Sequence, residues 1–279
     1  MLSYRHGFHA GNHADVLKHF VQLQVLRYLN QKDKAWWYID THAGAGLYRL
    51  DEGYATKLSE WQDGVGRLWG RDDVPAALHD YLGLVRSLNP DGRLRGYPGS
   101  PWIALQASRE QDRLRLFELH GNESDYLAEN MLPGKARTQI TAGDGLKGLK
   151  ALLPPPPRRA LTLIDPSYEV RDEYALVVAT LEDALQRFAT GTYAVWYPQL
   201  SKPESRRLPD QLKALPARSW LHVSLSVAAP GAVGMHGSGM FVINPPWTLE
   251  AELKSVMPWL ASTLAQDDDA GFVLESRSD

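Results

Sequence analysis

Three segments of the sequence place carboxylates and glycines where a bound nucleoside would need them. The run 40–46 (Asp-Thr-His-Ala-Gly-Ala-Gly) joins an acid to two glycines, 142–145 (Ala-Gly-Asp-Gly) does the same, and Glu118 ends an apolar run between them. Glycine lets a backbone pass close to a ligand, and a carboxylate accepts hydrogen bonds from ribose hydroxyls or an amino group. Each segment alone is also compatible with a plain turn, but together they favour an adenosine ligand. The third glycine of a dinucleotide fingerprint is replaced by Arg49, and a P-loop lysine is absent, so no pyrophosphate site is indicated.

A fourth carboxylate begins the segment Asp165-Pro166-Ser167-Tyr168. The Asp165 carboxylate and the Pro166 carbonyl can accept both N–H bonds of an exocyclic amino group, which aligns the nitrogen and stabilises the positive charge that grows on it. Tyr168 offers a face on which an extruded base can stack. The segment resembles the Asp/Asn/Ser-Pro-Pro-aromatic motif of S-adenosylmethionine-dependent methyltransferases that act on amino nitrogens, with Ser167 in place of the second proline. Serine does not fix φ as proline does, so rigidity is lost but no reacting atom is.

The elements that must position these residues are expected to alternate between strand and helix. Apolar runs predict seven strands, over residues 36–40, 114–118, 138–141, 160–165, 192–197, 220–227 and 239–244. This alternation predicts an α/β fold, a Rossmann-like, mostly parallel seven-stranded sheet, in which ligands bind at the carboxyl ends of the strands. The last two strands follow each other without a helix and are expected to form an antiparallel pair at one edge.

That antiparallel pair decides between two similar motifs. Asn244-Pro245-Pro246-Trp247 matches the amino-methyltransferase pattern more literally than the segment at Asp165 does. It follows the seventh expected strand, whose end would lie on the side of the sheet away from the other strand ends. We therefore expect residues 244–247 to be a structural turn and Asp165–Tyr168 to be the active motif.

The remaining segments are assigned from capping and periodicity. Asn12 is expected to cap a buried helix over 16–29, with Asp15 three residues later as a variant of the capping box. Residues 51–97 have helical periodicity and no strand signal, which predicts a helical insertion. The predicted organisation is therefore 1–50 (N-terminal loop, helix and first strand), 51–97 (insertion) and 98–279 (the rest of the same domain), with a frayed acidic end.

The composition excludes several kinds of protein. The 279 residues contain no cysteine, which excludes disulfides, thiolate catalysis and iron–sulfur clusters. No apolar run is long enough for a membrane span and no signal core begins the chain, so we expect a cytoplasmic protein without membrane contact. The closely spaced histidines 6, 9, 13 and 19 lack a known ligand spacing, and we expect no metal.

The net charge of −3 includes −4 in residues 261–279, whereas 1–34 and 201–222 each carry an excess of +3. The acidity therefore does not argue against a nucleic-acid partner.

Longer motifs make a family resemblance specific. The chain resembles the RlmJ family of bacterial 23S ribosomal RNA adenine-N6 methyltransferases in several segments. These are residues 1–6 (Met-Leu-Ser-Tyr-Arg-His), 9–19, 40–46, 97–101 (Tyr-Pro-Gly-Ser-Pro) and 244–247, with Gly191–Ala194 and Trp196–Pro198. The resemblance implies a class I methyltransferase fold, S-adenosylmethionine as methyl donor and an adenine at position 2030 of 23S rRNA as target. It assigns cofactor contacts to His19, His42, Ser100, Glu118, Gly143 and Asp144. It also makes Asp165 the catalytic aspartate and places Tyr4 against the RNA.

The sequence as a whole predicts a monomeric rRNA adenine-N6 methyltransferase. We expect S-adenosylmethionine over Gly44, Gly46, Glu118 and Asp144, and the unstacked adenine between Asp165, Pro166 and Tyr168. An N-terminal loop with Tyr4, His6 and Lys18 is expected to close over the base. Two alternatives remain: a DNA adenine-N6 methyltransferase, and a non-catalytic RNA-binding protein with a decayed site, suggested by Ser167. Whether naked 23S rRNA or an assembling subunit is the substrate is left open.

Overall fold

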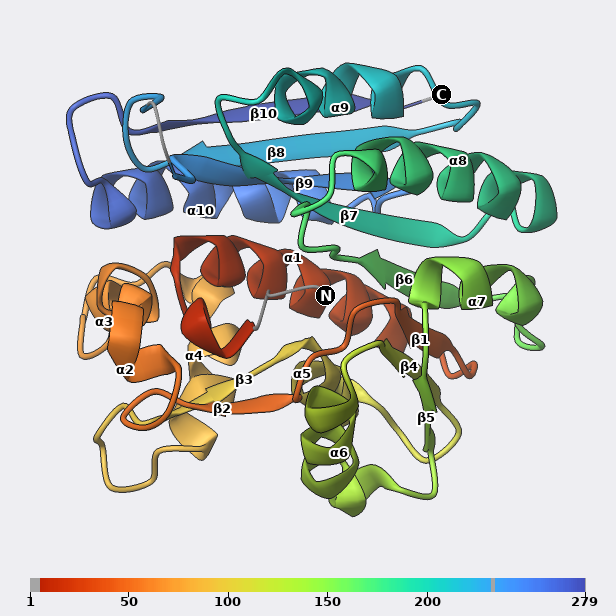
Figure 1. The fold of residues 1–279 in the computed structure, drawn as a ribbon, viewed down its shortest axis with the longest axis horizontal. Coiled ribbons are helices and arrows are strands. Elements are labelled where there is room, and N and C mark those ends of the chain that lie inside the picture. Colours follow the sequence, from red (N-terminus) through yellow and green to blue (C-terminus); the bar gives the residue numbers. More distant parts are fainter. Residues whose placement is uncertain (1–5, 232–233, 279) are drawn as a thin grey trace.

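A mixed eight-stranded sheet runs through the centre of the computed structural model, which describes residues 6–231 and 234–278 (Figure 1). The strand order is β10-β8-β9-β7-β6-β1-β4-β5. The eight strands are β1 (Trp37–Asp40), β4 (Arg113–Glu118), β5 (Thr138–Ala142), β6 (Ala160–Ile164), β7 (Thr192–Gln199), β8 (Trp220–Ser226), β9 (Gly237–Ile243) and β10 (Gly271–Arg277). Tyr4, expected to contact RNA, lies outside the described residues.

The half of the sheet that carries the predicted site is parallel. β5, β4, β1, β6 and β7 pair in this order with parallel registers, so that Asp40 lies beside Leu116 on β4 and Leu163 on β6. Except for the outer strand β5, which is largely exposed, these strands are mostly buried, and every residue of β6 is buried. Burial on both faces is what a parallel sheet covered by helices requires. The carboxyl ends of these strands consequently meet at one edge, as the sequence predicted.

The other half is antiparallel and corrects the expected strand number. β9 pairs antiparallel with both β7 and β8, which confirms the direction expected for the seventh strand. The sheet has eight strands rather than seven, because residues 271–277, expected to be frayed, form β10 against β8. β8 and β9 are therefore not the edge pair, and β10 is outermost. Phe272 and Val273 are good strand formers, but the backbone of β8 is what completes their hydrogen bonds.

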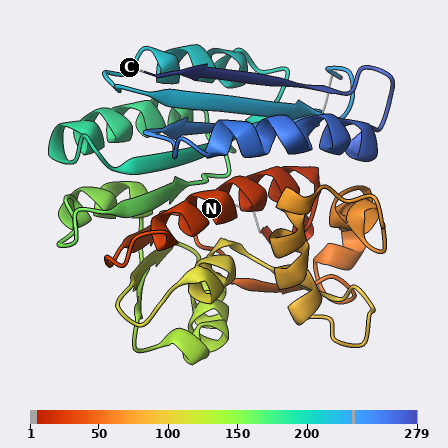
Figure 2. The ribbon, with the colours of Figure 1, turned by 180° about the vertical axis from the view of Figure 1, so that it is seen from behind.

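Helices cover both faces of the sheet (Figures 1 and 2). α7, α8 and α9 pack in sequence on one face, while α1, α5 and α10 cover the other. The helices are α1 (His13–Asn30), α2 (Ala55–Leu58), α3 (Val65–Leu68), α4 (His79–Ser87), α5 (Ser100–Ala107), α6 (Gly121–Asn130), α7 (Gly145–Leu152), α8 (Asp172–Arg187), α9 (Pro203–Lys213) and α10 (Leu249–Leu264). The short 3₁₀ turns within the described residues are η1 (His6–Phe8), η2 (Glu60–Asp63), η3 (Ala76–Leu78) and η4 (Leu132–Gly134). No helix among the described residues has both the length and the apolar character needed to cross a bilayer.

α1 is buried around most of its circumference and carries charged residues into the core. Asn12 caps it as predicted, its side chain accepting hydrogen bonds from the backbone N–H groups of Ala14 and Asp15. The Asp15 carboxylate does not complete a capping box at Asn12. It accepts from the Gly11 N–H at 2.9 Å and turns inward. Asp15 and Lys18 are both nearly inaccessible to solvent, and buried charges of this kind need partners.

The predicted insertion begins and ends at a two-stranded ribbon. β2 (Leu47–Arg49) pairs antiparallel with β3 (Gly96–Pro98), and α2, α3, α4 and two of the 3₁₀ turns, η2 and η3, lie between these strands in the sequence. The sequence predicted no strand over residues 51–97. This prediction is wrong at residues 96 and 97, which belong to β3. The ribbon fixes the entry and exit of this segment. The division of the chain at residues 50 and 97 stays a prediction.

Candidate active site

A cavity of about 660 Å³ opens where β1, β4, β5 and β6 end. Its volume lies within the range of small-molecule sites. The cavity brings together nine of the residues predicted from sequence: His6, Lys18, His19, His42, Gly44, Ser100, Glu118, Asp144 and Asp165. Gly46, Gly143, Pro166 and Tyr168 do not line it.

The first wall is the turn after β1, and Asp40 organises it. This carboxylate is fully buried and accepts from the Tyr38 hydroxyl (2.7 Å), the Ser100 hydroxyl (2.7 Å) and the His42 N–H (3.2 Å). Asp40 thus joins the turn to the start of α5. Gly44 has φ +60°, and a Cβ there would lie 2.2 Å from the Tyr48 hydroxyl, so no other residue fits this turn without displacement.

Glu118 connects the turns after β1 and β4. One carboxylate oxygen accepts from the Gly44 N–H and the other from the His120 N–H, each at 2.8 Å. The side chain is buried yet lines the cavity. Because each carboxylate oxygen has two acceptor positions, Glu118 can hold both turns and still accept from a ligand hydroxyl.

His42 and Asp144 form the wall beyond β5. Burial lowers the pKa of His42 to about 4, with Asp144 opposing the shift, so the imidazole is neutral near pH 7. Asp144 caps α7, accepting from the Lys147 N–H at 3.1 Å and pairing with the Lys147 ammonium at 2.9 Å. Burial raises the pKa of Asp144, but the contacts with Lys147 outweigh it and leave that pKa below its usual value. Asp144 is therefore an ionised acceptor at the cavity.

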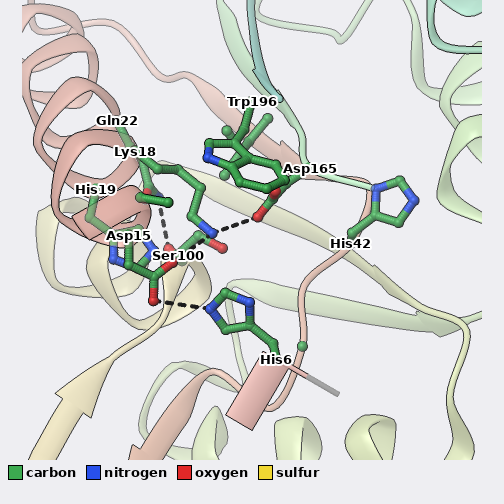
Figure 3. A network of polar contacts seen from close by, with 12 residues as sticks. His6, Asp15, Lys18, His19, Gln22, His42, Ser100, Asp165 and Trp196 are labelled. Atoms are coloured by element: carbon green, nitrogen blue, oxygen red, sulfur yellow. Dashed lines mark hydrogen bonds and ion pairs between the residues drawn. The ribbon is translucent and has the colours of Figure 1, made fainter. Parts of the chain in front are cut away.

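A chain of charged groups from η1 and α1 reaches Asp165 (Figure 3). The Lys18 ammonium lies 2.6 Å from Asp165 Oδ2 and 2.9 Å from Asp15 Oδ1, and His6 Nε2 lies 3.0 Å from Asp15 Oδ2. Burial lowers the pKa of Lys18, yet the two carboxylates outweigh burial and raise it above its usual range. Burial also raises the pKa of Asp165, and Lys18 opposes that shift. Among the described residues Asp165 Oδ1 has no hydrogen-bond partner, which leaves one oxygen of this carboxylate available at the cavity.

His19 supplies a neutral, partly unsatisfied group to the same wall. Burial lowers its pKa to about 3, and its Nδ1 lies 2.8 Å from the Tyr97 hydroxyl. Its Nε2 is buried without a hydrogen-bond partner although the residue lines the cavity. Buried polar atoms are normally satisfied, so an unpartnered one on a cavity wall is a place where a ligand can bind.

Tyr168 is not where stacking on a base would require it. It is 1 % exposed, its hydroxyl donates to the Trp196 carbonyl at 2.9 Å, and its ring packs on Tyr174 with centroids 4.4 Å apart. Ser167, which replaces the second proline, lines the cavity instead. The structure thus brings Asp165 and Ser167 to the cavity and places the aromatic ring behind them.

The second motif, residues 244–247, follows the end of β9. Because β9 is antiparallel to β7, this end lies on the side of the sheet away from the carboxyl ends of the parallel strands. Asn244 has φ +51°, and its side-chain amide donates to the Ala189 and Gly191 carbonyls at 2.8 and 2.7 Å. Asparagine tolerates this left-handed conformation well. These contacts support the expected structural turn.

Among the residues that support the cavity walls without lining the cavity, Asp15, Asp40 and Trp196 were not singled out from the sequence as parts of the site. Asp15 was interpreted only as a helix cap, and Asp40 only as the start of a glycine turn. A carboxylate at the end of a buried strand was a usable signal for Asp40. Trp196 has the Lys18 ammonium 5.9 Å from its ring (Figure 3), a contact that no local pattern could indicate. No group of three metal-ligating side chains occurs within residues 6–231 and 234–278.

Comparisons with known proteins find relatives over nearly the whole chain. The family model described as ribosomal RNA large subunit methyltransferase D, RlmJ, matches residues 33–275. Ribosomal RNA large subunit methyltransferase J of Escherichia coli (strain K12) is 48 % identical, over 95 % of this chain and 94 % of its own, and its Haemophilus influenzae counterpart is 44 % identical over 99 % and 98 %.

The fold has a solved relative as well. The crystal structure of protein LPL1258 from Legionella pneumophila is 35 % identical, with a TM-score of 0.90 over 97 % of this chain and 99 % of that one. The central sheet, with five parallel strands and an antiparallel β9, is that of a class I methyltransferase. The chain belongs to the RlmJ family of ribosomal RNA large subunit methyltransferases.

Proposed function

We propose that this protein is an S-adenosylmethionine-dependent methyltransferase that modifies N6 of one adenine in 23S rRNA, at position 2030 by resemblance to its family. The observation that carries the proposal is Asp165. Its carboxylate lies at the cavity, held through one oxygen by Lys18 and with the other oxygen available. A cytoplasmic monomer stays a prediction, as does the choice between naked rRNA and an assembling subunit.

The cavity residues suit S-adenosylmethionine. Glu118 and Asp144 are acceptors for the ribose hydroxyls and the adenine amino group, Gly44 leaves room for close approach, and His19 Nε2 is an unpartnered polar atom on the wall. When bound, the cofactor supplies an electrophilic methyl group on a sulfonium. Ser100, fixed by Asp40, and the neutral His42 complete the group of residues that would hold it.

Asp165 orients and stabilises the amino group that is to be methylated. Because Lys18 occupies Oδ2, Oδ1 is the oxygen that accepts an N–H from the adenine amino group. The Pro166 carbonyl stays the predicted second acceptor, although Pro166 itself does not line the cavity. Accepting both N–H bonds draws the nitrogen lone pair out of conjugation with the ring. The carboxylate then stabilises the positive charge that grows on nitrogen, a type of contribution worth several kcal/mol (about 3–4 kcal/mol for comparable groups).

Asp15 sets the charge balance around this carboxylate. Without Asp15, the Lys18 ammonium, which lies 2.6 Å from Asp165, would neutralise the Asp165 carboxylate. The pair would then no longer favour positive charge on the adenine nitrogen. Asp15, 2.9 Å from the same ammonium, returns a net negative charge to the group. Burial raises the pKa of Asp15, but His6 and Lys18 outweigh burial and hold that pKa well below its usual range, so it stays ionised at neutral pH.

The burial of Tyr168 changes how the base is expected to be held. With the Tyr168 ring packed behind the cavity, the polar contacts of Asp165 and Pro166 would provide the orientation. His6 and Lys18 line the cavity on the same side as Asp165, to which Lys18 is bonded. We propose that they contact the target nucleotide.

The test is methyl transfer from labelled S-adenosylmethionine to purified 23S rRNA, followed by nucleoside analysis for N6-methyladenosine. Methylation of one adenine that is abolished in Asp165→Ala, with calorimetric binding of S-adenosylhomocysteine retained, is the expected result. A matched reaction with DNA distinguishes the DNA methyltransferase alternative. Intact RNA binding without any methyl transfer would favour the non-catalytic alternative and overturn the proposal.

A further inference from the structure

The edge of the sheet opposite the cavity carries a concentration of positive charge. The segments 31–36, 108–115, 131–137 and 153–159 lead into, or begin, β1, β4, β5 and β6, so the parallel pairing of these strands gathers them at one edge. Together they contain nine lysines and arginines against three acidic residues, an excess of six positive charges in a protein whose net charge is −3. We name these four segments the basic edge.

Among the described residues, the acidic residues of the basic edge pair with Arg109 alone of its cations, and Glu110 pairs with none of them. Asp112 is fully buried and is used internally, accepting from the Trp36 N–H and pairing with Arg109. Asp33 extends into solvent with its side chain 98 % exposed and 4.0 Å from Arg109. Within the described residues no carboxylate lies within 4 Å of a side-chain nitrogen of Arg113, Arg115 or Arg158.

Arg113 and Arg115 form the centre of this surface. They are two residues apart on β4 and therefore face the same side of the sheet. The Arg115 guanidinium lies 4.1 Å from the ring centroid of the partly exposed Trp37 on the neighbouring strand. Burial, together with the nearby Arg113, lowers the pKa of Arg115. Two adjacent guanidinium groups without a counter-ion repel each other, and an anion between them relieves that repulsion.

Both arginines keep hydrogen-bond donors for such an anion. Arg113 uses Nη1 to donate to the Glu110 and Asp112 carbonyls, and Arg115 uses Nη1 to donate to the Leu114 carbonyl. The other guanidinium nitrogens have no partner among the described residues. A planar guanidinium group with two free N–H groups can donate to two phosphate oxygens at once. It therefore suits a phosphate better than an acceptor that offers a single oxygen. Arg158, in the loop before β6, adds an exposed cation although its φ of +52° would favour glycine or asparagine.

The charge distribution selects RNA phosphate as the occupant. The cavity edge, comprising residues 40–46, 118–123, 142–145 and 165–171, has six acidic residues and one arginine, so it does not attract a polyanion. β4 joins the two edges, and its six residues span about 17–20 Å. An RNA that extends by several nucleotides beyond a base in the cavity can therefore reach the basic edge.

We propose that the basic edge binds the phosphate backbone of rRNA flanking the target adenine, without reading its sequence. This inference rests on the proposed function. It makes Arg113, Arg115 and Arg158 determinants of RNA affinity and gives them no part in methyl transfer.

The experiment compares Arg113→Gln/Arg158→Gln with a control, Arg187→Gln/Lys254→Gln, which removes the same charge from α8 and α10, where each cation is paired with a carboxylate. RNA affinity is measured over a series of salt concentrations with a long 23S rRNA fragment and with a trinucleotide centred on adenosine. For the long RNA, the slope of log Kd against log salt should fall by about 0.7–0.9 for each phosphate that the variant no longer binds, and the control should keep the wild-type slope. Trinucleotide binding should not change.

Methylation of the same two RNAs separates this inference from the proposed function. The basic-edge variant should raise KM for the long RNA at unchanged kcat and leave the trinucleotide reaction as it is. If the wild-type protein methylates neither RNA, the proposed function fails while the salt slopes still decide the role of the basic edge. A slope equal to that of the control overturns the inference, and so would equal reductions in affinity for long and short RNA.

Discussion

The two edges at which the parallel strands begin and end differ in charge and in how that charge is used. At the cavity edge the carboxylates are already engaged: Glu118 holds two turns and Asp165 holds Lys18. At the basic edge Arg113 and Arg115 donate only to nearby carbonyls and keep further donors. One sheet thus carries a pre-arranged polar site on one side and an unneutralised charge on the other. Short-range orientation and long-range attraction are therefore separate tasks in this molecule.

The strongest test of the cavity edge is Asp165→Asn, which keeps the shape of the side chain and removes its charge. We expect methyl transfer to fall by at least about 10²–10³-fold, because stabilisation of positive charge on nitrogen is removed. Turnover and calorimetric binding of S-adenosylhomocysteine would be measured together, and binding should persist. Near wild-type turnover would remove Asp165 from its proposed role.

Acid should destabilise the cavity side of the fold. Burial lowers the pKa of His13 and His42 to about 4 and that of His19 to about 3. The unfolded chain binds protons on these histidines below about pH 6.5 and the folded chain does not, so stability falls as pH drops from about 6.5 towards 4. Each histidine contributes a loss of about 2 kcal/mol between about pH 7 and pH 5.

Denaturant unfolding at the two pH values measures this loss. His42→Asn removes one of the three groups, so its stability should depend less on pH by about one third. Equal stability of the wild-type protein at both pH values would contradict the burial of neutral histidines at this edge.

The charge balance at Lys18 is tested by Asp15→Asn. Removing one negative charge about 7–8 Å from the methylated nitrogen costs about 2 kcal/mol at an effective dielectric constant of ~20, or a loss of roughly thirtyfold in kcat. KM for the cofactor should not change. In a double-mutant cycle with Lys18→Met, this direct electrostatic cost of Asp15→Asn should persist, because it does not act through the ammonium. An unchanged kcat in folded Asp15→Asn would show that Asp15 is only structural.

The smallest effect is expected at the similar motif on the other side of the sheet. Asn244→Gly keeps the left-handed conformation and removes the hydrogen bonds to Ala189 and Gly191. Stability should fall by about 1–2 kcal/mol. The kcat of folded protein should stay at the wild-type value. A selective loss of kcat would place residues 244–247 in the chemistry and break the distinction between the two edges.

The sequence predicted the parallel half of the fold well because most of its strands are short, buried apolar runs. It failed at β10, whose residues are largely exposed and gain their hydrogen bonds only from β8. The same distinction between local patterns and long-range contacts explains which parts of the site were predicted. Strand-end acids and glycines are local signals, and they led to the cavity. The pairing of Lys18 with Asp165 joins residues 147 positions apart, and the burial of Tyr168 depends on Tyr174 and Trp196. Only tertiary packing determines contacts of this kind.

The placement of α1 has a consequence for how the protein is made. This first helix, apolar on most sides, packs against β9 and α10, which belong to the last part of the sequence. During synthesis the part of its apolar surface that faces β9 and α10 must wait until residues 237–264 have left the ribosome. Contacts of such long sequence separation make folding slow. They also mean that the helix that carries Lys18 is fully packed only when nearly all of the chain has been synthesised.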